Sequence, residues 1–166
     1  MLAIVTPIGQ AHERRGRALL TAFAAHHKSE FIATPPNAAA PVDGLCVRAG
    51  VVRCVVEAKV RGGYSLADIR RMGGTVILSK SKLDGLATAS RTLGVASFFV
   101  AEFSDGTRWF WQVSDAEGRP SCAWNVRPSV TRADSIGTET VERENGFLSL
   151  DSGVCWLAPE EHEDVG

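Results

Sequence analysis

Two carboxylates and a lysine lie in the most strand-prone part of this chain, between Pro41 and Lys59. Asp43 opens one short apolar run, and Glu57 and Lys59 close the next, two positions apart. Because side chains alternate along an extended strand, Glu57 and Lys59 share a face. Carboxylates among apolar residues are costly to desolvate unless they hold a cation or pair with a charge. A magnesium ion fits this set, since it binds one or two carboxylates together with water and substrate phosphate.

The pairing register of the two runs decides whether the carboxylates can meet. Ala49-Gly50 lies between the runs and indicates a tight turn that joins antiparallel strands. Directly opposed residues of such a pair point to the same face, and a plain two-residue turn at this point places Asp43 and Glu57 on opposite faces. We therefore predict an odd loop or a β-bulge near Gly50, which shifts the register by one residue.

This segment resembles the motif of the PD-(D/E)XK, or restriction-endonuclease-like, nuclease superfamily, in its small single-domain phage and bacterial form. Pro41-Val42-Asp43 and Glu57-Ala58-Lys59 match the motif, with one extra residue between the proline and the aspartate. The resemblance covers residues 10–113 by order of elements. It implies that Asp43 and Glu57 bind Mg²⁺, for which Mn²⁺ is expected to substitute, with help from the Ala58 carbonyl. It also implies that Lys59 assists the attacking water.

The hydrophobic pattern predicts elements in the order that this superfamily requires. We expect an α/β fold with a restriction-endonuclease-like αβββαβ core, whose mixed central sheet is flanked by helices. Predicted helices span 10–27, 65–72 and 82–93, and predicted strands include 30–34, 75–79, 95–103 and 108–113. Asn145-Gly146 predicts a further turn, so residues 114–166 are interpreted as a C-terminal β-hairpin extension of a single 1–166 domain.

Glu13 and two lysines are further candidates for the site. Glu13 shares a helix face with Leu20 and Ala24, and members of the superfamily often add a helical Glu to the metal site, although a first-turn Glu is also favoured by the helix dipole alone. Lys82, and secondarily Lys80, stand where strand 75–79 turns into the next helix. Free backbone N–H groups at a helix start favour an anion, so these lysines are predicted to hold a DNA phosphate; the alternative is a solvated pair.

The charge distribution favours a nucleic-acid partner. The net charge is −1, but residues 1–91 hold 13 Lys/Arg against 6 Asp/Glu, whereas residues 92–166 hold 5 against 13. This asymmetry predicts one basic face. The four cysteines lack zinc-site spacing and are interpreted as reduced, mostly buried thiols. With no apolar run of membrane-spanning length and no signal-peptide pattern, we expect a cytoplasmic protein that has no membrane partner and is compatible with a homodimer.

These features together predict a magnesium-dependent nuclease that hydrolyses DNA phosphodiester bonds without a fixed sequence specificity. A reacting phosphate carries no base information, which is why sequence-independent cleavage is the expectation. Three alternatives stay open: a non-catalytic nucleic-acid-binding or assembly module on the same fold, a branched-DNA resolvase, and an unrelated α/β protein in which Glu57 and Lys59 merely pair on the surface.

Overall fold

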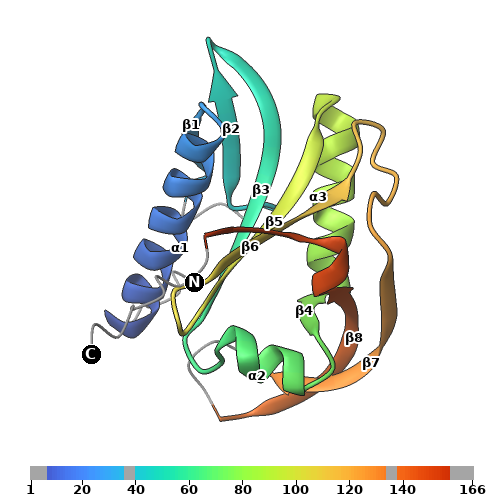
Figure 1. Cartoon of the computed structure of the whole chain (residues 1–166). Coiled ribbons are helices and arrows are strands. Elements are labelled where there is room, and N and C mark those ends of the chain that lie inside the picture. The colour runs from blue at the N-terminus through green and yellow to red at the C-terminus, as the bar shows by residue number, and fades with distance from the viewer. Residues whose placement is uncertain (1–6, 36–39, 134–137, 158–166) are drawn as a thin grey trace, which may run out of the picture.

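A mixed six-stranded sheet forms the centre of the computed structural model, which describes residues 7–35, 40–133 and 138–157 (Figure 1). The elements, in chain order, are α1 (Pro7–His26), β1 (Glu30–Ala33), β2 (Gly44–Arg48), β3 (Val51–Arg61), α2 (Leu66–Arg71), β4 (Thr75–Ser79), α3 (Lys80–Leu93), β5 (Ala96–Phe103), β6 (Arg108–Ser114), β7 (Trp124–Arg132), β8 (Thr140–Ser149), a 3₁₀ turn (Leu150–Ser152) and β9 (Val154–Leu157). The protein is therefore of the α/β class, as the sequence predicts.

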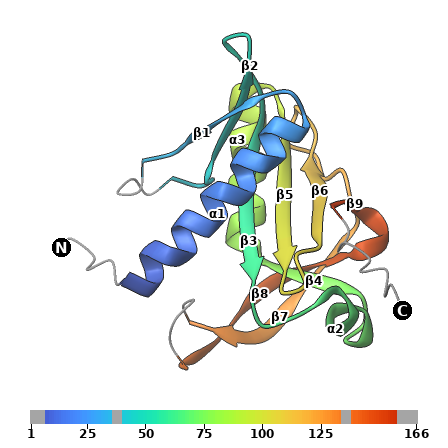
Figure 2. The same cartoon turned by 60° about the vertical axis from the view of Figure 1, so that its left-hand side comes forward.

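The strands form two sheets. The larger has the order β1-β2-β3-β5-β6-β9, in which β3 and β5 are parallel and the other neighbours are antiparallel. The smaller is antiparallel, with the order β4-β8-β7. Helix α1 lies across one face of the larger sheet, whereas α3 lies behind the other face (Figure 2). The chain thus passes from β3 through α2, β4 and α3 before it returns to the sheet as β5.

Each face of the larger sheet has its own hydrophobic core. On one face, α1 buries Leu19, Leu20 and Phe23 against residues that include Val56 of β3. On the other, α3 and the smaller sheet pack against residues that include Val55 of β3. Side chains alternate along a strand, so the odd-numbered residues of β3 from Val55 onward, Glu57 and Lys59 among them, lie on the α3 side.

The β2–β3 hairpin contains the predicted register shift. Its turn is the two-residue Ala49-Gly50 turn, and positive φ angles of 51° and 73° at these residues give it the twist that suits a tight hairpin. Val47 is opposite Val52, but Cys46 is opposite Cys54, so Arg53 is an extra residue in β3. This bulge shifts the register by one residue. The prediction of a bulge near Gly50 is confirmed, three residues beyond the glycine.

The pattern-based assignments mostly hold, with two corrections in the smaller sheet. Helices are found at the three predicted places: α2 opens with a capping box at Ser65, and α3 ends at Gly94 in the left-handed conformation. The predicted strands 95–103 and 108–113 form a hairpin that turns at Asp105-Gly106. Strand 75–79, however, pairs with β8 and not with the central sheet. Asn145-Gly146 is not a turn but lies within β8, where both residues are buried.

The C-terminal third therefore does more than extend the core. Leu148 of β8 is fully buried, and β9 pairs with β6 at the edge of the larger sheet. The indole N–H of Trp111 donates to the Ser149 carbonyl at 2.7 Å, which ties β6 to the end of β8. Of the cysteines, Cys46 and Cys54 are buried free thiols that oppose each other, whereas Cys155 is exposed, so the expectation of mostly buried thiols is met only in part.

Among the described residues, no helix is long and apolar enough to cross a membrane.

Candidate functional site

Asp43 and Glu57 lie next to each other, Asp43 directly before β2 and Glu57 in the adjacent strand β3. The bulged register leaves Asp43 opposite Glu57, one pair beyond Gly44 and Val56. The Asp43 backbone N–H donates to the Val56 carbonyl at 3.1 Å, and its carboxylate Oδ2 accepts from the Ala58 backbone N–H at 2.9 Å. Asp43 therefore bonds to β3 on both sides of Glu57, through its backbone at Val56 and through its side chain at Ala58. Without the bulge at Arg53, this contact would be lost and the two carboxylates would face opposite sides of the sheet.

Glu57 is a buried carboxylate with one unpaired oxygen. The residue is 5 % exposed, and its Oε2 atom is buried without a hydrogen-bond partner among the described residues. Burial, and next the negative charge of Asp43, raise the pKa of Glu57 to about 7, against the lowering effects of Lys82 and Lys59. A buried acceptor that lacks a donor is costly, and a like charge beside it adds to that cost. Both costs would be relieved by a cation at Oε2.

Lys82 is the lysine that touches this carboxylate. Its Nζ atom lies 2.9 Å from Glu57 Oε1, and 38 % of its side chain remains exposed. Lys82 is the third residue of α3, so the first turn of this helix lies beside Glu57 of β3. The predicted position of Lys82 at a helix start beside the acidic pair is present, although in the free protein its partner is a carboxylate.

Lys59 shares the face of Glu57 but is more exposed. Its pKa is lowered because surrounding protein atoms displace part of its hydration and because Arg61 lies nearby; Lys82 and Arg143 act in the same direction, against Glu57. Lys59 is nevertheless exposed to solvent, so water limits how far its pKa is lowered. Cations thus outnumber the two carboxylates around this point, which favours an anionic ligand.

Two of the predicted residues are not brought to this group. Glu13 is exposed on α1 and pairs with Arg17 at 2.8 Å, and α1 covers the face of the sheet opposite to Glu57. The interpretation of Glu13 as part of the metal site is therefore not supported by its position. The helix-dipole alternative does not fit either, because α1 begins at Pro7 and Glu13 lies beyond its first turn. Lys80 pairs instead with Asp84 of the same helix at 2.6 Å.

Arg61 and Arg143 were missed in the sequence. Arg61 lies two residues beyond Lys59 in β3 and donates to the Ile77 carbonyl of β4. The alternation that joins Glu57 to Lys59 also includes Arg61, but the following Gly62-Gly63 suggested that the strand ends before it. Arg143 lies in β8, which reaches the site only because it pairs with β4. Arg143 lies near enough for its charge to lower the pKa of Lys59, and no local pattern predicts such proximity across more than 80 positions of chain.

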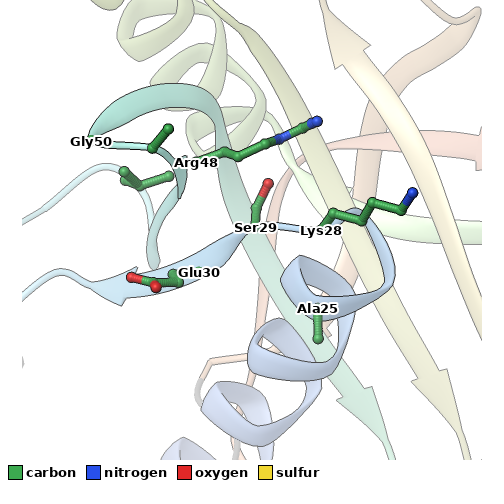
Figure 3. A pocket seen from close by; sticks show the side chains of 8 residues that line it. Ala25, Lys28, Ser29, Glu30, Arg48 and Gly50 are labelled. Atoms are coloured by element: carbon green, nitrogen blue, oxygen red, sulfur yellow. The ribbon is translucent and has the colours of Figure 1, made fainter.

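A separate hollow of about 360 Å³ lies at the opposite end of β3, where the C-terminal end of α1 meets the Ala49-Gly50 turn. Figure 3 shows the Lys28 and Arg48 side chains extending in the same direction, while Glu30 points the other way. Gly50 is seven residues from Glu57 along the strand, or roughly 20 Å at 3.3 Å per residue. The hollow brings together no carboxylate pair, so the acidic group on β3 is the better candidate for chemistry.

The chemistry of the group on β3 must be inferred from its own residues. No protein-family model matches the chain, and a search of curated proteins found no similar sequence. Within the described ranges, no cluster of three or more His, Cys, Asp or Glu side chains could hold a metal ion. A protein-only cage of the zinc type is therefore not found there. A pair of carboxylates beside lysines is instead the arrangement in which a hard ion shares its coordination with a phosphate and water.

Proposed function

We propose that this protein is a magnesium-dependent nuclease that hydrolyses DNA phosphodiester bonds, on a restriction-endonuclease-like core. The observation that carries the proposal is the meeting of Asp43 and Glu57 beside Lys59 and Lys82, around one buried and unpaired carboxylate oxygen. The order of α1, β1, β2, β3, α3 and β5 supports the same core, with α2 and β4 inserted before α3.

The residues present fit a magnesium ion. No described residue donates to Oε2 of Glu57, and the Asp43 charge lies close enough to raise the pKa of Glu57. A divalent cation would therefore relieve both the unpaired oxygen and the repulsion between the carboxylates. Asp43 and Glu57 would hold the ion, with the Ala58 carbonyl as a further oxygen ligand; Mn²⁺ would substitute. A bound Mg²⁺ supplies Lewis-acid polarisation of a phosphate oxygen and lowers the pKa of a water molecule.

The two lysines have different tasks in this scheme. Lys59 is exposed on the same face as Glu57, so its amine can hold the attacking water, and a lowered pKa brings it nearer to accepting a proton. Lys82 orients Glu57 through Oε1 and can also reach a phosphate, where its charge offsets the negative charge that develops during attack. The water oxygen attacks phosphorus, and the phosphorus–oxygen bond to the leaving sugar breaks.

The direct test is cleavage of plasmid DNA with and without Mg²⁺. We expect degradation that requires the ion, and we expect Lys59→Ala to abolish it while binding to DNA is largely kept. Arg119→Ala is a suitable control, because Arg119 is exposed and pairs with Asp115 and Glu117 away from this group. A wild-type protein that binds Mg²⁺ and DNA but leaves every substrate intact would instead indicate a non-catalytic module.

The cleavage products would show which class of nucleic acid the proposed nuclease acts on. Linear, circular and branched DNA would be compared under the same conditions, with single-stranded RNA as a further substrate. Cleavage of circular DNA requires an endonuclease, whereas cleavage confined to branch points would indicate a resolvase. The site residues contact a phosphate and not a base edge, so we expect products without a fixed sequence at their ends.

A further inference from the structure

The β7–β8 ribbon separates its charges between its two faces. Arg127 is opposite Asn145, and Ser129 is opposite Arg143, so both arginines lie on one face. Glu142 and Glu144 alternate with these positions and point to the other face. Within strands β7 and β8, the face that carries Arg127 and Arg143 therefore has no carboxylate.

The two arginines are held by neutral groups. The Arg127 guanidinium lies 4.1 Å from the centre of the Phe147 ring, and Arg143 donates to the carbonyls of Arg132 at 3.3 Å and Ala133 at 3.2 Å. In the part of the chain that the structure describes, neither arginine forms an ion pair. Their orientation is thus restrained by stacking and hydrogen bonds, while no carboxylate of the described residues pairs with their positive charges.

This face continues from the candidate site. The positive charge of Arg143 acts on Lys59, and Arg61 bonds to the carbonyl of Ile77, which pairs with Phe147 of β8. In both views the ribbon lies beyond the carboxyl-terminal end of β3 (Figures 1 and 2). Lys59, Arg61, Arg143 and Arg127 therefore lead from the acidic pair onto the ribbon. A chain of cations that starts at a phosphate-binding site is complementary to a charged polymer.

We infer that the face of the β7–β8 ribbon with Arg127 and Arg143 binds the sugar-phosphate backbone of duplex DNA, next to the phosphate that is cleaved. The inference rests on the proposed function and adds to it the surface that holds the substrate beyond the reacting centre. Because guanidinium groups on a ribbon of this kind contact phosphates, the contact is independent of sequence. It is made only by a duplex that is long enough to reach from the acidic pair to the ribbon.

The test measures DNA binding in the Lys59→Ala background, so that the duplex stays intact. Arg127→Ala, Arg143→Gln and the double variant are compared with Arg132→Ala, whose side chain lies on the opposite face of the same ribbon. Affinity is measured by fluorescence anisotropy over a series of salt concentrations and duplex lengths. We expect the slope of log affinity against log salt to fall by about 0.9 for each lost phosphate contact, and only with the longer duplexes.

The controls keep the possible outcomes separate. Arg127 is exposed, so Arg127→Ala should fold normally even if Arg143→Gln unfolds, and thermal unfolding checks both. Slopes equal to that of Arg132→Ala at every duplex length would overturn the inference while leaving the nuclease proposal intact. Failure of the Lys59→Ala protein itself to bind DNA would overturn both. Weaker binding of polyglutamate with unchanged binding of DNA would assign the face to an acidic protein and also overturn the inference.

Discussion

Replacing Glu57 with glutamine should stabilise the metal-free protein at alkaline pH. Glu57 is buried and its pKa is raised from 4.5 to about 7, mainly by burial and next by Asp43. Below pH 4.5 the side chain is protonated in both the folded and the unfolded chain. Between these two pKa values the unfolded chain releases the proton first, so the free energy of unfolding falls as pH rises. Above the pKa of Glu57 in the folded protein, the carboxylate is charged in both states, and the folded protein bears the full cost of burying it.

The size of the effect follows from the shift. One pKa unit corresponds to about 1.36 kcal/mol, so a shift from 4.5 to about 7 corresponds to roughly 3 kcal/mol. Glutamine has nearly the same shape but no charge. We therefore expect Glu57→Gln to be up to about 3 kcal/mol more stable than wild type at pH 8, and within about 1 kcal/mol of it at pH 5. The attraction between Lys82 and Glu57 already lowers the pKa of Glu57. Its effect is therefore contained in the value of about 7 and is not added to the expected difference in stability.

The assay is urea denaturation between pH 5 and pH 8.5 in the presence of a chelator, followed by tryptophan fluorescence. Glu102→Gln serves as the control, because Glu102 lies in the same sheet and pairs with Arg108 at 2.7 Å but is more exposed than Glu57. A difference between Glu57→Gln and wild type that is the same at every pH would refute the reasoning. The reasoning would also be refuted if the free energy of unfolding of wild type rose from pH 5 to pH 8 more steeply than that of Glu57→Gln.

Three further predictions concern the metal, the lysines and the hairpin. Mg²⁺ should raise the melting temperature of wild type more at pH 8 than at pH 6, because the ion needs ionised Glu57. It should leave the melting temperature of Asp43→Ala unchanged. Equal increases in the melting temperature of wild type at both pH values would contradict this. Lys82→Ala should weaken DNA binding and flatten its salt dependence more than Lys80→Ala, since Lys82 contacts Glu57 whereas Lys80 pairs with Asp84. Identical binding isotherms for the two variants would argue against the assignment of Lys82 to a phosphate. Gly44→Ala should destabilise the protein by about 1–3 kcal/mol, because the added Cβ would meet the Ile32 carbonyl and the Phe31 ring; a midpoint of urea unfolding equal to that of wild type would be inconsistent with this packing.

Local patterns in the sequence already determine much of this protein. The period of two along residues 51–61 places Glu57 and Lys59 on one face, and the paired positive φ angles at Ala49-Gly50 suit the tight turn that these residues favour. The capping box at Ser65 and the glycine after Leu93 bound α2 and α3. These features depend on interactions between residues a few positions apart, which is why they can be predicted without knowledge of the fold.

Tertiary structure decided which of these elements meet. The register prediction required a bulge, but only the packing of both faces of β3 places the extra residue at Arg53 and so brings Asp43 to Glu57. The partner of β4 is a strand about 70 residues later in the chain, and that pairing alone brings Arg143 to Lys59. Glu13 shows the reverse case. Its helix forms where the pattern predicts it but packs on the other face of the sheet, because apolar burial, and not the charge of one exposed carboxylate, determines how a helix is docked.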